Sequence, residues 1–181
     1  MRKVVLFIAM SLDGYIADRH GGVDWLSGQS GTAAENDSYA AFIRDIDTVI
    51  MGWNTYHQIV TELSPEEWVY EGLQSYVVTH RACESTRSIR FTPEKPRELV
   101  EKLRQEPGKD IWICGGASIV RQLMEADAID RFHISMIPTL LGGGIRLFDT
   151  LAREQKLSLV KSRAENGIVE LIYEKRAGCG E

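Results

Sequence analysis

Residues 111–116 read IWICGG, an apolar run that ends in two glycines, and residues 117–126 follow with apolar side chains at helical spacing. This pattern predicts a buried strand that passes directly into a helix. Glycine backbone permits close approach of a ligand, and the free N–H groups at a helix N-terminus attract anions. The junction therefore suits an anion such as a cofactor pyrophosphate. The alternative is a tight turn that binds nothing, because a lone glycine pair is weaker than the full dinucleotide-binding fingerprint.

Length and composition indicate one domain. The chain has 181 residues, of which 44% are hydrophobic and 26% charged, enough for one sizeable core. We expect a single domain over residues 1–176 and a short tail over residues 177–181. A net charge of −5, with no Lys/Arg run longer than two residues, disfavours nucleic acid as a partner. The apolar runs are too short to span a bilayer or to make a convincing signal peptide, so we expect a cytoplasmic protein that does not bind a membrane.

The cysteines and histidines give no support to disulfide or metal chemistry. Cys83, Cys114 and Cys179 are odd in number and widely spaced, which favours reduced thiols. Cys114 ends an apolar strand and is expected to be a small buried side chain rather than a nucleophile. The four histidines have neither helical pairing nor zinc-site spacing to a cysteine, so no metal site is predicted.

Strands and helices alternate along most of the chain. Strands are predicted over residues 4–9, 48–51, 76–79, 111–114 and 131–137, and helices over residues 35–44, 55–60, 96–106 and 117–126. Residues 155–162 and 168–175 alternate apolar and polar side chains around Asn166-Gly167, a favoured hairpin turn. Strands joined by helical crossovers should be parallel and covered on both faces. The expected fold is an α/β/α three-layer sandwich with a mostly parallel sheet and a C-terminal antiparallel hairpin.

Five segments resemble the dihydrofolate reductase fold in their order and spacing. They are residues 9–17 (AMSLDGYIA), 49–56 (VIMGWNTY), 77–81 (VVTHR), 113–124 (ICGGASIVRQLM) and 138–148 (PTLLGGGIRLF). More specifically, residues 3–175 resemble the reductase domain of riboflavin-pathway deaminase-reductases. The resemblance implies the fold predicted above and an NADPH-dependent reductase of the 5-amino-6-(5-phosphoribosylamino)uracil reductase type, which transfers hydride to a nitrogen heterocycle.

The resemblance also implies where the nicotinamide binds. In this family the first strand and the loop after it line the nicotinamide, which places Ala9, Asp13 and Ile16 beside the reactive ring. Core packing is the alternative for Ala9 and Ile16, and Asp13-Gly14 also fits a turn whose carboxylate bonds nearby backbone N–H groups. We retain Asp13 as a site residue because α/β proteins bind ligands at the carboxyl ends of their strands.

The segment MGWNT, residues 51–55, resembles the family's second cofactor motif. The resemblance assigns close backbone approach to Gly52 and a helix cap beneath the phosphates to Thr55. Position 53 usually holds an arginine in the family, whereas Trp53 can stack but cannot neutralise a phosphate. We expect Arg81 to replace that arginine at the 2′-phosphate of NADPH; the alternative is a solvated surface arginine. The other implied cofactor positions are Thr79 and His80 on the adenosine side and Cys114, Gly115, Gly116, Ala117 and Ser118 at the diphosphate turn, with a cis peptide between the two glycines.

The sequence indicates the hydride acceptor less clearly than the cofactor. Asp37 lies where the family places an acid on the first helix and is our candidate proton donor; the alternative is a helix N-terminal acid that interacts with the helix dipole. A strict folate reductase is disfavoured because no Arg or Lys lies between Trp53 and Arg81 to hold a glutamyl carboxylate. Compared with the riboflavin-pathway enzymes, Phe7 replaces a lysine and Cys114 replaces a glutamate, while an Asp-Asn-Pro segment is absent from residues 58–66.

Three functions therefore stay open. The first is the riboflavin-pathway type of reductase, the second is a dihydrofolate or pteridine reductase, and the third is a non-catalytic NADP-binding module. A homodimer is also expected, through an exposed apolar edge formed by Phe132, Ile134 and Met136, although strands of this type are more often part of a core.

Overall fold

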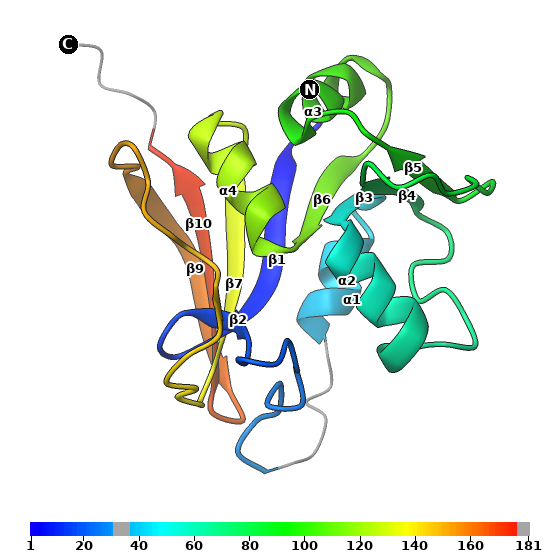
Figure 1. Ribbon diagram of the computed structural model, residues 1–181. Helices are drawn as coiled ribbons and strands as arrows, with labels where there is room; N and C mark the ends of the chain where they lie inside the picture. Colours follow the sequence, from blue (N-terminus) through cyan, green and yellow to red (C-terminus); the bar gives the residue numbers. More distant parts are fainter. Residues whose placement is uncertain (31–36, 177–181) are drawn as a thin grey trace.

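The computed structural model describes residues 1–30 and 37–176 (Figure 1). Eight strands form the central sheet, in the order β5-β4-β3-β6-β1-β7-β10-β9. All neighbouring pairs from β5 to β7 are parallel, and β10 pairs antiparallel with both β7 and β9. The strands are β1 (Val4–Ser11), β3 (Ile46–Gly52), β4 (Gln74–Val78), β5 (Ile89–Thr92), β6 (Asp110–Gly115), β7 (Arg131–Ile137), β9 (Leu157–Glu165) and β10 (Ile168–Lys175).

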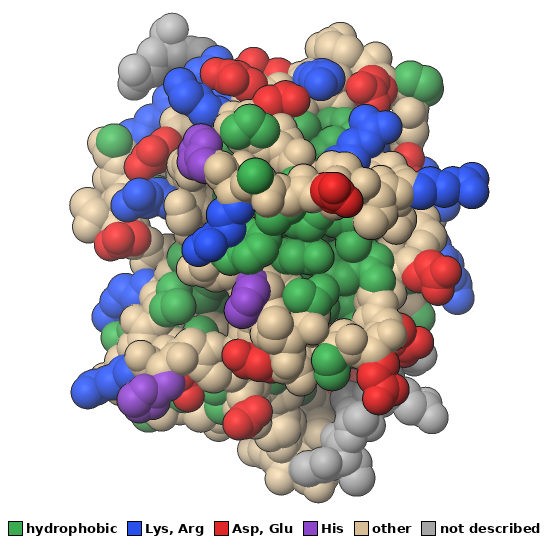
Figure 2. All heavy atoms as spheres, turned by 45° about the vertical axis from the view of Figure 1, so that its right-hand side comes forward, with side chains coloured by type: hydrophobic (Ala, Val, Ile, Leu, Met, Phe, Trp, Pro, Cys, Tyr) green, Lys and Arg blue, Asp and Glu red, His purple; other side chains and the backbone are tan. Residues whose placement is uncertain are grey.

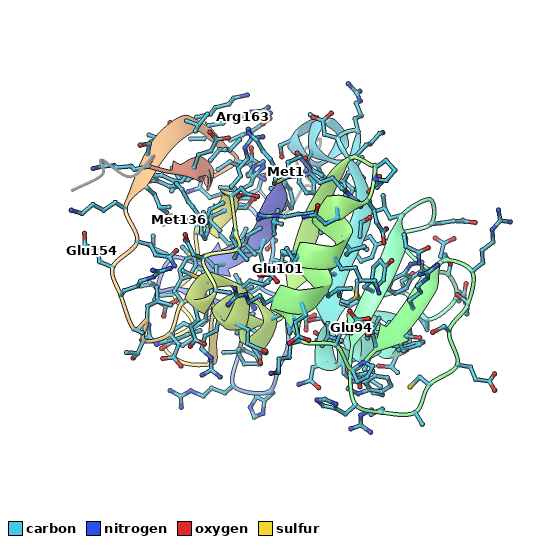
Figure 3. The ribbon with its side chains drawn as sticks, turned by 90° about the horizontal axis from the view of Figure 1, so that it is seen from above. Met1, Glu94, Glu101, Met136, Glu154 and Arg163 are labelled. Carbon is cyan, nitrogen blue, oxygen red and sulfur yellow. The ribbon has the colours of Figure 1, made fainter. Side chains whose placement is uncertain are left out.

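Helices cover both faces of the sheet, which confirms the three-layer sandwich. The first face packs against α3 (Pro96–Gln105) and α4 (Ala117–Glu125), whose buried side chains share one apolar cluster with β1, β6 and β7. The opposite face packs against α1 (Asp37–Ile43), α2 (Trp53–Gln58) and the π-helical turn η1 (Ile59–Leu63), which share an aromatic-rich cluster. Seen from above, Glu101 on α3 and Arg163 on β9 lie on opposite sides of the sheet (Figure 3).

The predicted strands and helices are confirmed with small shifts at their ends. The predicted hairpin reverses direction at Asn166 and Gly167. Their φ values of 50° and 77° are those of a type I′ turn. The predicted helix over residues 35–44 begins at Asp37 in the described part of the chain. Three short strands were missed: β5, β2 (Tyr15–Ala17) and β8 (Ile145–Arg146). Two to four residues are too few to show a period, so only their partner strands define them.

The prediction that the apolar side chains of β7 form an exposed edge for a homodimer is wrong. Phe132 and Ile134 are only 2% and 4% exposed and pack in the core under α4, because β7 lies between β1 and β10 rather than at an edge. The exposed apolar side chains at the actual edge strand β9 are Leu159 and Val160, each 55% exposed. The homodimer itself stays a prediction. The tail, residues 177–181, lies outside the described residues. Within residues 1–30 and 37–176, no helix is long and apolar enough to cross a membrane.

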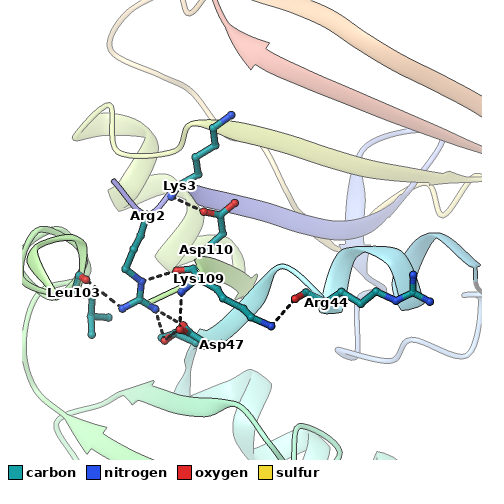
Figure 4. Close-up of polar contacts among 8 residues, drawn as sticks. Arg2, Lys3, Arg44, Asp47, Leu103, Lys109 and Asp110 are labelled. Atoms are coloured by element: carbon teal, nitrogen blue, oxygen red, sulfur yellow. Dashed lines mark hydrogen bonds and ion pairs between the residues drawn. The ribbon is translucent and has the colours of Figure 1, made fainter. Parts of the chain in front are cut away.

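A buried arginine joins the elements at the amino ends of the strands (Figure 4). The Arg2 side chain is 5% exposed and forms an ion pair with Asp47. It also donates hydrogen bonds to Thr48 Oγ1 at 2.6 Å, to the Lys109 carbonyl at 2.6 Å and to the Leu103 carbonyl at 3.2 Å. Asp47 in turn accepts the backbone N–H of Lys109 at 2.7 Å. This network ties the N-terminus to β3, to the end of α3 and to the start of β6.

Candidate functional site

Two glycines bring the starts of α2 and α4 together at the carboxyl ends of β3 and β6. The N-cap residues are Gly52 and Gly116, and neither helix start has a side-chain cap within the described residues. A Cβ atom on Gly52 would lie 3.3 Å from Ile119 Cγ1 and 3.9 Å from the Gly116 nitrogen, and one on Gly116 would lie 3.4 Å from Thr55 Oγ1. Uncapped helical N–H groups beside bare backbone are suited to bind an anion.

The residues of the two glycine motifs lie largely as predicted. The peptide between Gly115 and Gly116 is cis, which confirms the expectation from the family resemblance. Ala117 and Ser118 open α4, and the Ser118 side chain is exposed. The capping role given to Thr55 is wrong, because α2 begins two residues earlier and Gly52 occupies the cap. The Thr55 hydroxyl instead faces Gly116, where it borders the space between the two helix starts.

Arg81 lies against the tryptophan that replaces the family's arginine. Its guanidinium carbon is 4.9 Å from the centroid of the Trp53 ring, a distance typical of a cation–π contact. Thr79 is buried, and its hydroxyl accepts the backbone N–H of Arg81 at 3.1 Å, while His80 is exposed. The side chain of Arg81 is thus exposed but positioned, at the same end of the sheet as Gly52. Seen from the side of α2, hydrophobic side chains gather on the surface with Lys, Arg and His side chains at their margin (Figure 2).

The loop after β1 is tied to the loop after β7. The Asp13 carboxylate accepts the Ser11 hydroxyl at 2.5 Å and the backbone N–H groups of Leu141 and Gly142 at 3.1 and 2.7 Å. The Ser11 hydroxyl and these N–H groups lower the pKa of Asp13 to about 2. Strands β2 and β8 pair between the same loops. The carboxylate therefore holds the loop, as the turn interpretation proposed, but through residues far along the chain; contact of Asp13 with a cofactor stays a prediction.

Two adjoining pockets lie on the α1 face of β1, β7 and β10. The Ala9 pocket, of about 220 Å³, is lined by Phe7, Ala9, Leu26, Ser135, Ile137, Glu165 and Ile168. The His133 pocket, of about 400 Å³, is lined by Val5, Ala41, Phe42, Asp45, Ile46, Asp110, Arg131, His133, Lys161 and Ile172. Both share Ser38, Arg163 and Glu170. Ile16 is half-buried and packs instead against the core on the α4 face.

Asp37 begins α1, one residue before Ser38, which lines both pockets. Its side chain lies outside the described part of the chain, so the role of proton donor stays a prediction. The Ser38 hydroxyl donates a hydrogen bond to Glu170, which joins α1 to β10 across the pockets.

An aromatic cluster occupies the place of the family's lysine. The Phe7 ring stacks on Phe42, with centroids 4.2 Å apart and planes at 18°, and meets the His133 ring edge-on at 4.4 Å. Behind it, the Cys114 thiol lies 3.4 Å from the Tyr70 hydroxyl, and burial raises the pKa of Cys114 to about 11. The thiol is therefore protonated and lies toward Tyr70. Only the backbone of Cys114 is then available for a cofactor contact.

The residues of the His133 pocket were not identified from the sequence. Along β7, residues 131, 133 and 135 alternate with the buried Phe132 and Ile134. This alternation indicates a polar face of the strand and could have drawn attention to the pocket. The partners on β10 lie far along the chain and could not be inferred. In the part of the chain that the structure describes, no group of three His, Cys, Asp or Glu side chains could hold a metal ion.

Comparisons with known proteins identify the family of the chain. Residues 2–169 match the model of the RibD C-terminal domain. Two Bacillus subtilis (strain 168) proteins, the uncharacterized YwjB and YyaP, are 39% identical over 175 residues and 29% identical over 182 residues. These alignments cover 95% of this chain in both cases, and 97% and 94% of the relatives.

Solved structures show the same fold. A putative riboflavin biosynthesis protein from Shewanella sp. PV-4 superimposes with a TM-score of 0.83 at 27% identity, over 97% of this chain and 99% of the other. A Thermotoga maritima diaminohydroxyphosphoribosylaminopyrimidine deaminase/5-amino-6-(5-phosphoribosylamino)uracil reductase has a TM-score of 0.72 at 14% identity, over 96% of this chain and 56% of the other, and shares the fold. The chain belongs to the RibD C-terminal domain family, a riboflavin-pathway reductase-like family with the dihydrofolate reductase-like fold.

Proposed function

We propose that this member of the RibD C-terminal domain family is an NADPH-dependent reductase of the riboflavin-pathway type that transfers a hydride to a nitrogen-heterocycle substrate. The observation that carries the proposal is the meeting of Gly52, Gly116 and the start of α4 at one end of the sheet, with Arg81 positioned beside them on Trp53. Backbone N–H groups suit a diphosphate, and a fixed guanidinium suits a phosphate monoester. NADPH carries both groups.

The residues at this end fit such a cofactor. The space that a side chain on Gly116 would enter is bordered by the Thr55 hydroxyl, a polar group that a phosphate oxygen could accept from. Arg81 is the candidate for the 2′-phosphate, and the backbone of residues 115–118 is the candidate for the diphosphate. Bound NADPH would supply the hydride. Ala9, at the carboxyl half of β1, lines a pocket of about 220 Å³ that has room for the heterocycle that receives the hydride.

The protein then needs to orient the acceptor, exclude water and deliver one proton. Reduction of a C=N bond places the hydride on carbon and a proton on nitrogen, so one donor is required. Asp37 is the candidate donor, directly or through a water molecule, because α1 starts beside the pockets. The neighbouring Ser38 is already engaged with Glu170 and is therefore assigned a positioning role.

Isotope transfer tests this function. We would incubate the protein with NADPH deuterated at C4 and a panel of aminouracils and dihydropterins, and measure NADPH oxidation together with deuterium in the product. We expect stoichiometric transfer to one class of heterocycle, and a reduced rate with unchanged NADPH binding for Asp37→Asn. Reduction of dihydrofolate that is blocked by methotrexate would support the folate reductase instead. NADPH binding without transfer to any acceptor would leave a non-catalytic NADP-binding module.

A further inference from the structure

A buried histidine without a partner faces a pocket that the cofactor does not explain. His133 is 7% exposed, and its Nε2 atom is buried without a hydrogen-bond partner within residues 1–30 and 37–176. Buried polar atoms nearly always have a partner, so an unpaired one on a residue that lines a pocket points to a ligand group as the missing partner. The 400 Å³ pocket is also of the size that small molecules occupy.

The histidine is neutral and therefore favours a neutral partner. Burial lowers the pKa of His133, the charges of Arg131 and Lys161 lower it further, and Glu170 opposes them. A neutral imidazole offers one N–H donor and one acceptor nitrogen. A lactam or hydroxyl group can pair with either nitrogen, because such groups both donate and accept. The Phe42 ring, which also lines this pocket, adds an apolar wall that favours an uncharged ligand.

The charges around the pocket disfavour a phosphate. Arg131 is paired with Glu174 at 2.6 Å, and Arg163 is paired with Glu165 on the same strand. Lys161 has no ion pair in the described residues, but Glu170 shares this pocket with it. Asp45 and Asp110 add two further carboxylates to the lining. A dianionic phosphate would therefore meet one unpaired cation and several carboxylates. These contacts would not compensate for the free energy that the phosphate loses when its hydration shell is removed.

We propose that the acceptor is a heterocycle without a phosphate group, whose ring lies in the Ala9 pocket and whose neutral polar substituent enters the His133 pocket. The proposal deepens the proposed function and rests on it. The two pockets share Ser38, Arg163 and Glu170 and are therefore adjacent, so a molecule that extends past these side chains would reach both. The lining also accounts for one family group replaced in this chain, because a substrate without a phosphate needs no lysine where Phe7 stands.

A matched pair of ligands tests this inference by calorimetry, with and without NADPH. The probes are 5-amino-6-(ribosylamino)uracil and its 5′-phosphate. We expect the riboside to bind at least about tenfold more tightly than the phosphate, and His133→Leu to weaken riboside binding by at least about tenfold because a ligand group loses its partner. NADPH affinity should not change in this variant. Lys161→Ala, which removes the unpaired cation, should change riboside binding by less than about threefold.

A second variant keeps the test independent of the stability of His133→Leu. Ala41 lies on the exposed side of α1 and lines the pocket, so Ala41→Leu should fill the space and weaken riboside binding while His133 stays in place. Equal or tighter binding of the phosphate would overturn the proposal, as would wild-type riboside binding by both variants. If the protein binds the riboside but not NADPH, the proposed reductase function fails while the pocket assignment stands.

Discussion

The two ends of the central sheet use their polar groups in opposite ways. At the amino ends of the strands, Arg2 satisfies Asp47, Thr48 and two backbone carbonyls in a buried network (Figure 4). At the carboxyl ends, Gly52 and Gly116 precede helix starts that have no side-chain cap among the described residues. Groups that are satisfied internally stabilise the fold, whereas groups left open are available to a ligand. Stability should therefore depend on the first end and cofactor binding on the second.

The largest expected effect is at the amino end. Arg2→Leu leaves two carbonyls without donors and also removes the cation beside the partly exposed Asp47, so we expect a loss of about 3–5 kcal/mol in the free energy of unfolding. Urea denaturation measures this loss. The matched control is Lys3→Leu, because Lys3 is exposed and its ion pair with Glu174, at 3.1 Å, should contribute less than about 1 kcal/mol. NADPH affinity of the folded Arg2 variant should be unchanged; equal losses for both variants would remove the contrast between the ends.

Gly116→Val should weaken cofactor binding more than it lowers stability. Its Cβ would stand 3.4 Å from Thr55 Oγ1, and its methyl groups would extend into the space beside the two helix starts. We expect NADPH to bind at least about 100-fold more weakly, which corresponds to about 2.7 kcal/mol. Fluorescence titration measures the affinity, and Ala40→Val, on the exposed side of α1, is the control. A valine variant that folds and keeps its affinity would show that the diphosphate does not lie at this turn.

Arg81→Ala should affect one phosphate rather than the whole cofactor. A charge-assisted phosphate contact contributes about 1.5–3 kcal/mol, so we expect the preference for NADPH over NADH to fall by about tenfold or more. Affinity for NADH should change little. The control is Arg121→Ala, which removes an exposed arginine in the middle of α4. Equal weakening of both nucleotides would indicate that Arg81 acts by supporting Trp53 instead of by binding the 2′-phosphate.

The smallest expected effect concerns the loop held by Asp13. Its pKa is lowered from 3.8 to about 2 in the folded protein, so the folded state favours the ionised carboxylate. The stabilisation is therefore complete above about pH 5 and is lost as the pH falls through 3.8 towards about 2. We expect the urea midpoints of wild type and Asp13→Asn to differ by a constant amount above about pH 5, and to converge below pH 4. A difference that persists unchanged to pH 2 would contradict this role.

The carboxyl end of the sheet was predictable because its signals are local. Gly115 and Gly116 follow an apolar run and precede a helical pattern within a few residues, and the hairpin at Asn166-Gly167 is equally local. The sequence also indicated Arg81 as the replacement for the arginine that the family has at position 53, but the contact of its guanidinium with the Trp53 ring was seen only in the structure.

The remaining features depend on residues far apart in the sequence. Asp13 bonds Gly142 across 129 positions, and Ser38 bonds Glu170 across 132. No local pattern specifies such pairs. The position of β7 between β1 and β10 is likewise a property of strand order, which is why its apolar side chains were wrongly expected at an edge. The His133 pocket forms between α1 and β10 and was missed for the same reason.

The most direct test of the account is equilibrium binding of NADPH and NADH to the folded wild-type protein, followed by protein fluorescence. Trp53 lies against Arg81 and provides a reporter at the site. We predict saturable binding with one NADPH per chain and a preference over NADH of at least about tenfold. A folded protein that binds neither nucleotide would contradict the assignment of the carboxyl end of the sheet as a cofactor site.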